Sequence, residues 1–287
     1  SLMNYADIKL GTWYPMGGMK AVVDGMLALA KEKGVEIRLN EPVIGFEYKG
    51  NRISNVLSEN AVYPADVVVA GADYQHVESR LLAPEFRSYS QKYWESRLLA
   101  PSSLLFYLGF DRPIPDIHHH TLFFDEPFGP HAEAIYTTRE WPTKPLFYVN
   151  VPSKTDRDVA PAGCENMVVL IPIAAGLEDT EDVREHYFQL IFNRFQHHYG
   201  DDFKKYIVFK KSYAVKDFIS DYNSFKGNAY GLANTLMQTA ILKPSLKSKK
   251  LSNLYYTGQL TVPGPGVPPS LISGEVVANE VIKDFKL

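Results

Sequence analysis

The sequence is poor in several features that define common classes of protein. It contains one cysteine, Cys164, so no disulfide forms within the chain, and this composition fits a reducing, cytoplasmic compartment. No apolar run reaches the roughly 18 residues that a membrane-spanning helix needs. The formal net charge is −3, and no basic field or nucleic-acid-binding module is visible, so no nucleic-acid partner is expected. No zinc-type spacing of cysteine and histidine occurs either, so no metal is expected.

A further absence concerns nucleotide binding. No G-x-G-x-x-G lies between a strand and a helix, and the Gly17-Gly18 pair has the wrong spacing. A complete dinucleotide fold uses that turn for the pyrophosphate, and an acidic residue about twenty positions later for the ribose. The chain is therefore expected to carry at most one side of a dinucleotide site.

The composition that is present suits a folded core. Of the 287 residues, 45% are hydrophobic and 22% are charged, which fits one large or two modest globular domains. Aromatic residues reach 13%. They indicate either a well-filled core or a large apolar ligand pocket, which aromatic side chains commonly line.

The hydrophobic pattern predicts a mixed α+β fold, with a hairpin-rich centre flanked at both ends by pieces of a β-α layer. Apolar residues recur at helical spacing from Met19 to Ala30, and Gly34 ends that run. Helices are predicted at 19–30, 181–198 and 270–285. Strands are predicted at 36–39, 43–48, 52–57, 65–70, 104–110, 121–124, 146–151, 167–173, 203–211 and 254–257.

The last strand leads into a loop crowded with glycine and proline. Gly258 follows the strand directly, and a missing Cβ there lets a ligand approach the backbone. Gly264 and Gly266 bracket Pro265, and Ser270 is predicted to be the N-cap of the last helix. A helix start of this kind suits an anionic or electron-rich group. The alternative is a plain strand-turn-helix connection without a ligand.

Several motifs in this chain occur in one known family in the same order. They are Tyr14-Pro15-Met16-Gly17-Gly18, His119-His120-Thr121, Thr155-Asp156 with Ala160 to Cys164, Asn228-Ala229-Tyr230-Gly231 continuing to Lys243-Pro244, and Asn253 to Gly258 with Pro263 to Pro268. The chain resembles the C-terminal two-thirds of the phytoene desaturase family, the carotenoid desaturases within the FAD-dependent amine-oxidase-like superfamily. The family's opening segment, with the glycine-rich turn, has no counterpart here.

The resemblance implies an FAD cofactor, with a site that is incomplete in this chain. It implies a partial Rossmann-like FAD domain with the start of the substrate domain at 3–73, a β-sheet substrate-binding domain at 74–250, and a C-terminal FAD segment at 251–287. Gln259 departs from the pattern, since the superfamily often has an acidic residue there and many desaturases have alanine. The implied cofactor-binding residues are Val43 near the adenosine, Gly71, Ala72 and Asp73 beside the nucleotide, Gly258 and Gln259 at the pyrophosphate and ribityl chain, and Gly266, Val267 and Pro268 against the isoalloxazine.

The chemistry also points to a flavin. Removing hydrogen from an unactivated hydrocarbon exceeds what side-chain acids and bases achieve, whereas a flavin accepts hydride and the protein supplies shape and water exclusion. We therefore expect an apolar, carotenoid-like substrate, hydride transfer to the flavin and loss of a neighbouring proton, with no catalytic residue assigned. Residues expected near the substrate are His119, His120, Phe123 and Phe124, with Phe106, Tyr107, Phe147 and Tyr148 as further linings or ordinary core.

Alternatives remain open at this point. Within flavoenzymes, the chain could serve an amine oxidase or a carotenoid isomerase. In another class, it could be a non-catalytic folding module or apolar-ligand-binding module, because the dinucleotide site is incomplete. Substrate solubility makes peripheral membrane contact reasonable, although no basic amphipathic helix stands out. Hydrolase chemistry is not favoured, because Ser102, Ser103 and Cys164 have no recognisable base partner.

Overall fold

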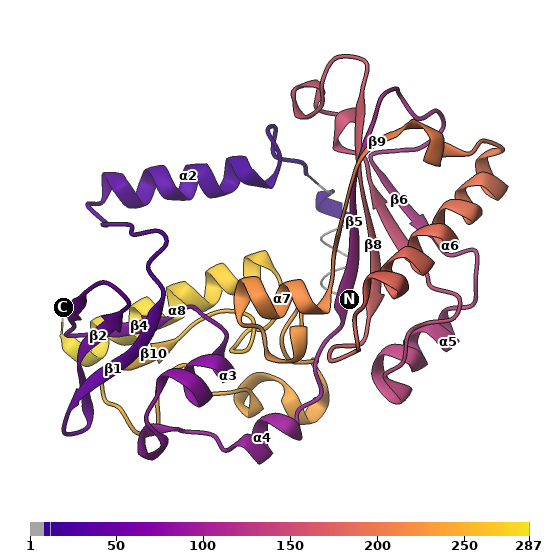
Figure 1. Cartoon of the computed structure of the whole chain (residues 1–287). Helices are drawn as coiled ribbons and strands as arrows, with labels where there is room; N and C mark the ends of the chain where they lie inside the picture. The colour runs from indigo at the N-terminus through magenta and orange to yellow at the C-terminus, as the bar shows by residue number, and fades with distance from the viewer. Residues whose placement is uncertain (1–8, 12, 287) are drawn as a thin grey trace.

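A computed structural model describes residues 9–11 and 13–286, and these form two layered bodies (Figure 1). Within this part of the chain the strands form three sheets, in the orders β1-β2-β3, β10-β4 and β6-β7-β8-β5-β9. The mixed α+β fold is confirmed. The start of the first predicted segment, Met3, lies outside the described residues, and the domain boundaries after 73 and 250 stay predictions.

The larger sheet is antiparallel throughout. Buried and half-buried residues alternate strictly along the strand Glu165–Ile173, so one face of the sheet is in the core and the other is not. Four of its strands match predicted ones closely. The strands are β5 (Ser102–Phe110), β6 (His120–Phe123), β7 (Phe147–Asn150), β8 (Glu165–Ile173) and β9 (Ile207–Tyr213).

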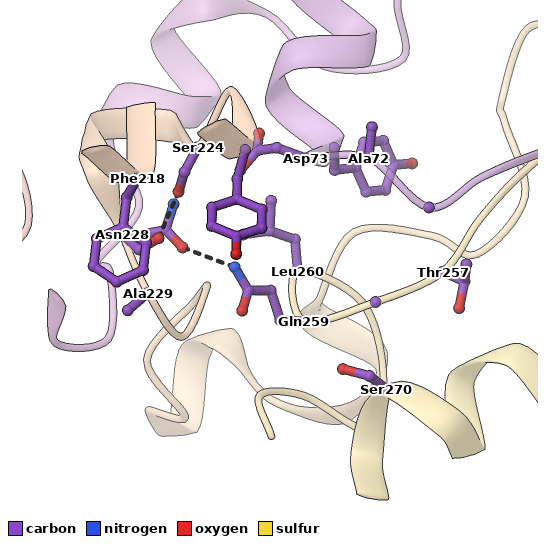
Figure 2. Close-up of a pocket in the computed structure, with 14 residues that line it drawn as sticks. Ala72, Asp73, Phe218, Ser224, Asn228, Ala229, Thr257, Gln259, Leu260 and Ser270 are labelled. Carbon is purple, nitrogen blue, oxygen red and sulfur yellow. Dashed lines mark hydrogen bonds between the residues drawn. The ribbon is translucent and has the colours of Figure 1, made fainter. Parts of the chain in front are cut away.

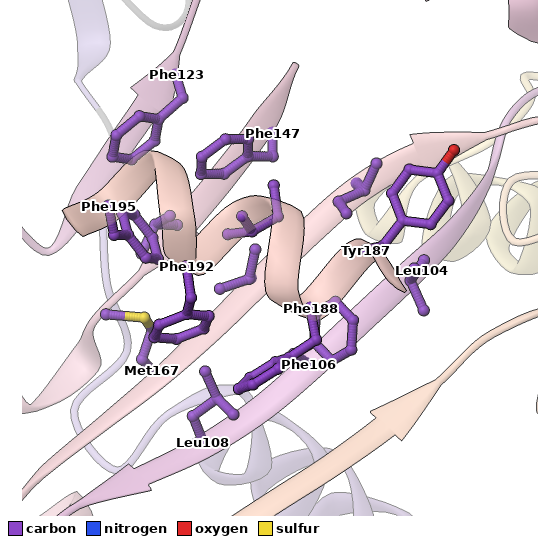
Figure 3. Close-up of a cluster of buried hydrophobic side chains, with 14 of the residues drawn as sticks. Leu104, Phe106, Leu108, Phe123, Phe147, Met167, Tyr187, Phe188, Phe192 and Phe195 are labelled. Carbon is purple, nitrogen blue, oxygen red and sulfur yellow. The ribbon is translucent and has the colours of Figure 1, made fainter. Parts of the chain in front are cut away.

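One long helix, α6 (Glu181–Tyr199), covers the core face of this sheet (Figure 3). Thr180 caps its N-terminus by accepting a bond from the N–H of Val183, and Gly200 ends it in the left-handed conformation. The helix predicted at 181–198 is confirmed. The buried residues of the helix are Arg184, Tyr187, Phe188, Ile191, Phe192 and Phe195.

The two faces of the sheet should differ in their contribution to stability. Ile171 points into the core and is fully buried, whereas its neighbour Leu170 lies on the opposite, partly open face. We expect Ile171→Val to lower the free energy of unfolding by about 1 kcal/mol, because a buried methylene is lost. The matched change Leu170→Val should cost clearly less. Urea denaturation of both variants measures the difference, and equal losses would show that both faces are packed.

The second body combines segments from both ends of the chain. The hairpin of β1 (Val43–Lys49) and β2 (Arg52–Ser58) carries β3 (Val62–Pro64) on its edge. Beside it, β4 (Val68–Ala70) pairs in parallel with β10 (Leu254–Tyr256), and α8 (Val267–Phe285) follows β10. Its remaining helices are α3 (Tyr74–His76) and α4 (Gln91–Glu95). In Figure 1, α2 (Met19–Glu32) stands apart from this body and has no buried residue, and α7 (Val215–Tyr222) lies between the two bodies.

A buried asparagine joins the two chain ends. The side chain of Asn253, which is fully buried, bonds to the N–H and the carbonyl of Ile53 and to the carbonyl of Asp66. Next to it, the stacked rings of Tyr74 and Tyr256 lie 3.6 Å apart. The Tyr256 hydroxyl donates to the buried carboxylate of Glu78. These contacts explain why the N-L-Y-Y sequence precedes the loop, since each polar group is satisfied inside the body.

Three local predictions were wrong. The segment 36–39 is irregular rather than a strand, since no neighbouring chain pairs with it among the described residues and its side chains are exposed. The strand predicted at 65–70 shortens to β4. Ser270 is not an N-cap, because α8 already begins at Val267. Pro268 and Pro269 occupy its first turn, where a missing N–H costs no helical bond.

Candidate functional site

The parallel pair β4 and β10 sets the position of the site. Both strands run in one direction, in the register Val68 to Leu254 and Ala70 to Tyr256, so their carboxyl ends meet at one edge. Gly71 and Thr257 emerge there side by side, and the Thr257 N–H donates to the carbonyl of Ala70. Ligands of open α/β layers bind outside the carboxyl ends of parallel strands.

A cleft opens at this edge (Figure 2). It holds a cavity of about 430 Å³, and an adjoining hollow of about 490 Å³ extends along the start of α8. The first cavity is lined by Gly71, Ala72, Asp73, Tyr74, Phe218, Tyr222, Ser224, Asn228, Ala229, Thr257, Gly258, Gln259, Leu260 and Ser270. The hollow adds Tyr230, Gly266, Val267 and Leu271.

Seven of the nine residues expected to bind a cofactor line these spaces. The two that do not are Val43, which begins β1, and Pro268, in the first turn of α8. The structure therefore brings together two predicted segments, 71–73 and 258–259, that lie far apart in the sequence. The roles of all nine residues toward a cofactor stay predictions.

At Gly258 the wall of the cleft consists of bare backbone. Its φ of +105° is one that residues with a Cβ rarely adopt, and a Cβ built there would meet nothing within 4 Å. The glycine is thus required by the backbone conformation and faces open space. Such a bare, open stretch of backbone fits a cofactor that approaches the chain closely.

A buried serine, which sequence reasoning missed, fixes the Gly258 loop to α8. The hydroxyl oxygen of Ser273 accepts a bond of 2.8 Å from the Gly258 N–H and lies 2.6 Å from the Thr257 hydroxyl oxygen. The same hydroxyl donates to the carbonyl of Ser270. The loop is therefore held by a fully buried hydroxyl group.

Asp73 lines the cleft, but its carboxylate already accepts hydrogen bonds from two backbone N–H groups. One of its oxygens accepts from the N–H of His76 and the other from the N–H of Phe225. Burial raises the pKa of Asp73 above its ordinary value, although these backbone bonds act in the opposite direction. Asp73 therefore joins the end of β4 to the loop after α7, and it is a structural wall rather than a free base.

The opposite wall comes from α7 and the loop after it, which sequence reasoning missed. Phe218 and Tyr222 lie four residues apart on α7 and face the cavity (Figure 2 labels Phe218). Asn228, also in this wall, accepts bonds at its side-chain oxygen from the Gly231 N–H and from the Gln259 side-chain amide. In the sequence, the four-residue spacing of these two aromatic residues indicates that they share one face of a helix. It was the one signal that could have located this wall.

An open, largely apolar sheet face continues from this wall. Cross-strand register places Tyr107 of β5 opposite Val168 and Lys211, and Leu105 opposite Leu170 and Tyr213. The Tyr213 ring contacts Phe218 edge-on at 5.0 Å, so the aromatic wall of the cleft reaches the sheet. Across β8, the rows continue to Tyr148 and Asn150 of β7 and to Leu122 and His120 of β6.

The residues predicted near a substrate divide between the two faces. His120 lies on the open face, where its ring bonds to the Tyr148 hydroxyl at 2.5 Å. Phe124 is 61% exposed just after β6. Phe123 is the correction: it is buried against Phe147 and α6, because its strand position points into the core. Of the further candidates, Phe106 and Phe147 are also core, whereas Tyr107 and Tyr148 are on the open face.

The histidines do not form a metal centre among the described residues, where no cluster of three His, Cys, Asp or Glu side chains occurs. The rings of His119 and His120 stack at 4.3 Å, instead of pointing to opposite faces as expected for a regular strand. His119 bonds to the Thr155 hydroxyl. Burial and the neighbouring His120 lower the pKa of His119.

The fold and the cleft together define a nucleotide-type β-α layer joined to an antiparallel sheet domain. Residues 1–282 match the family of flavin containing amine oxidoreductases. The chain belongs to this family, and membership implies a flavin cofactor.

The chain can also be compared with individual proteins. A carotenoid 3,4-desaturase from Haloarcula japonica is 41% identical over an alignment of 287 positions, which covers 99% of this chain and 58% of the relative. A zeta-carotene-forming phytoene desaturase from Myxococcus xanthus is 28% identical, over 98% of this chain and 54% of the relative. The chain thus spans little more than half the length of these relatives. A solved oxidoreductase from Methanosarcina mazei has the same fold, with a TM-score of 0.60 at 15% identity, covering 92% of this chain and 55% of that structure.

Proposed function

We propose that this chain is the catalytic-cleft portion of an FAD-dependent desaturase acting on a carotenoid-like substrate. The observation that carries the proposal is the continuity between the cleft at the β4–β10 edge and the open sheet face, made by Phe218 and Tyr213. A cofactor and an elongated apolar molecule could meet at that junction. The relatives named as carotenoid desaturases support this substrate class.

The described residues fit one side of an FAD. We assign the diphosphate and ribityl side to 71–73 and to Gly258 and Gln259, the ring side to 266–268, and the adenosine end to Val43. The bound flavin would supply the hydride acceptor. Because the sequence contains no strand-to-helix G-x-G-x-x-G, we infer that the main diphosphate-binding turn is supplied from outside these 287 residues.

The residues of the sheet would bind and orient the substrate. Leu105, Tyr107 and Leu122 lie on the open face, where a bound apolar substrate would cover them and water would be excluded from its reacting carbons. His119, His120 and Phe124 are kept as contacts at its far edge, beyond β7, and Phe123 is withdrawn. The described groups point to positioning and desolvation as this chain's contribution, and no catalytic residue is assigned.

Contact with a membrane surface stays a prediction. Among the described residues, none of the helices is both long enough and apolar enough to cross a bilayer. The side chains of Met19, Val23 and Met26 on α2 are each at least half exposed, which would suit a peripheral apolar contact.

Flavin content tests the proposal. Protein purified from its native cells is expected to carry about one FAD per chain, identified by its absorbance and by mass spectrometry. The isolated chain 1–287 should bind added FAD more weakly, because it lacks the glycine-rich turn. Native protein without any flavin would refute the function, and tight stoichiometric binding by the isolated chain would refute the incompleteness of the site.

Gly258 provides a sharper test of the cleft. We expect Gly258→Leu to weaken FAD binding about tenfold or more, because the new side chain fills the space that the bare backbone leaves. Fluorescence titration measures this. The matched control is Gly200→Leu at the end of α6, which has a φ of +74° and open surroundings but lies away from the cleft. Equal weakening in both variants would mean that backbone strain, and not the cleft, is responsible.

A further inference from the structure

Lys243 is a buried lysine whose ammonium has no partner among the described residues. The residue is 5% exposed, and its Nζ atom makes no hydrogen bond within the part of the chain that the structure describes. By contrast, the partly buried Lys154 bonds to Glu165 at 2.7 Å and to the carbonyl of Ile114. Burying an ammonium without a counter-charge is costly, and burial lowers the pKa of Lys243. A group of this kind calls for an anionic or electron-rich partner.

The position of Lys243 indicates where that partner lies. Its Cε atom is 3.5 Å from the place that a Cβ on Gly264 would take, and the Asn234 side chain packs there too. Two residues later, Gly266 precedes α8 and lines the hollow of the cleft together with Val267. Lys243 thus lies against the loop whose end borders the cleft.

The start of α8 is short of hydrogen-bond donors. A helix N-terminus normally presents several free N–H groups to an anion. Here Pro268 and Pro269 fill the second and third positions, so Val267 alone of the first three carries an N–H. An electron-rich group in the hollow would therefore receive the helix dipole but few direct bonds. A neighbouring cation supplies the charge that is missing.

We propose that Lys243 is the counter-charge of the flavin ring, stabilising the electron-rich reduced ring from behind the Gly264–Gly266 loop. The inference rests on the proposed function. The ring is favoured over the diphosphate because Lys243 packs against Gly264, on the chain segment that leads to the ring side of the cleft. Lys243 itself lines neither the cavity nor the hollow, so its charge would act through the loop.

Three probes separate the ring from the diphosphate. Riboflavin has the ring without a phosphate, ADP has the diphosphate without the ring, and FAD has both. The variants Lys243→Met and Lys243→Arg are made in the flavin-binding form of the protein. We expect Lys243→Met to weaken the binding of riboflavin and of FAD by similar factors, about tenfold each. The binding of ADP should be unchanged. The midpoint potential of the bound flavin should fall, and Lys243→Arg should restore most of both effects.

Stability without flavin separates a ligand role from a structural one. Removing an unpartnered buried charge should leave the flavin-free protein as stable as before or more stable. The matched variant Lys154→Met should destabilise it, because Glu165 loses its partner. Thermal denaturation of both flavin-free variants gives this comparison.

The outcomes are distinct. Unchanged riboflavin affinity and potential in Lys243→Met would overturn the inference while the proposed function stands. A loss of affinity confined to ADP and FAD would assign the Lys243 charge to the diphosphate and overturn the ring assignment. A destabilised flavin-free Lys243→Met protein would show a structural lysine. Failure of the unsubstituted protein to bind any flavin would overturn the proposed function itself.

Discussion

Arg184→Met is expected to lower the free energy of unfolding by about 3–5 kcal/mol, because it leaves a buried carboxylate without its partner. The Arg184 side chain is 8% exposed, and that of Asp179 is fully buried. The two form a paired bond, Nε to one carboxylate oxygen at 2.7 Å and a terminal nitrogen to the other at 2.6 Å. The same nitrogen bonds to Asp217 at 2.6 Å. Chemical denaturation followed by circular dichroism measures the loss.

The network is also relevant to the cleft. Asp217 lies in the first turn of α7, where it also accepts a bond from the N–H of Ala214. Phe218 is the next residue and lines the cavity. Arg184 therefore ties the helix over the sheet core to the aromatic wall of the cleft. We expect Arg184→Met to weaken FAD binding as well, although less than Gly258→Leu.

The cost of Arg184→Met should depend on pH. Burial opposes ionisation of Asp179, but the bonds from Arg184 and from the Lys216 N–H outweigh it, and the pKa of Asp179 lies below the ordinary 3.8. A lowered pKa contributes stability above the unfolded value, and this stability is lost as the pH falls through the folded value. The gap between the two proteins should therefore be constant near neutral pH and shrink below about pH 4. A gap that widens in acid would contradict this origin.

A double substitution tests whether the unpaired carboxylate causes the loss. Replacing both partners, Asp179→Leu with Arg184→Met, should recover much of the stability, because a buried ion pair exchanged for apolar side chains is often neutral. If the double variant is less stable than Arg184→Met alone, packing of the arginine stem or its bond to Ser212 accounts for the effect.

The sequence predicted elements whose pattern is local. The helix α6 has its own cap at Thr180 and a stop at Gly200, and the core strands show apolar alternation, so both were found. The helix α7 was missed because its eight residues are held by distant contacts, among them Asp217 to Arg184. The segment 36–39 shows strand-like alternation, yet pairing decides a strand, and no partner reaches it among the described residues.

Several of the cleft residues named from the sequence are glycines. Gly258 was named because bare backbone after a strand admits a ligand, and Gly71 because the resemblance implies it. Both line the cleft, and their roles toward a cofactor stay predictions. The polar residues that fix the walls of the cleft are Ser273, which bonds to Gly258, and Asn228, which bonds to Gly231 and Gln259. Nothing in their own sequence neighbourhood reveals these contacts. Asn228 even belongs to a motif of the resemblance, but its bond to Gln259 joins positions 31 residues apart. Phe123 and Phe124 were both named, but neighbouring residues of a strand point to opposite faces, so Phe123 lies in the core.

Gly231→Ala is expected to cost about 4 kcal/mol of stability and to disturb the cleft, because two chain segments touch there through bare backbone. A Cβ on Gly231 would lie 2.7 Å from the carbonyl oxygen of Gln259 and 3.0 Å from its carbonyl carbon. Its φ of +75° adds strain for any other residue. Since the obstacle is backbone, relief requires either Gln259 or the 228–231 turn to move, and both belong to the cleft.

The matched control is Gly163→Ala, at which φ is +79° and no atom lies within 4 Å of the added Cβ. It carries the same conformational strain without the clash, so it should cost about 1 kcal/mol. Thermal unfolding compares the two variants, and FAD titration of each shows whether the cleft has moved. Equal costs would mean that strain alone operates at Gly231. Full FAD affinity in Gly231→Ala would contradict a cofactor wall made by both Gln259 and the 228–231 turn, because one of the two must move to admit the added Cβ.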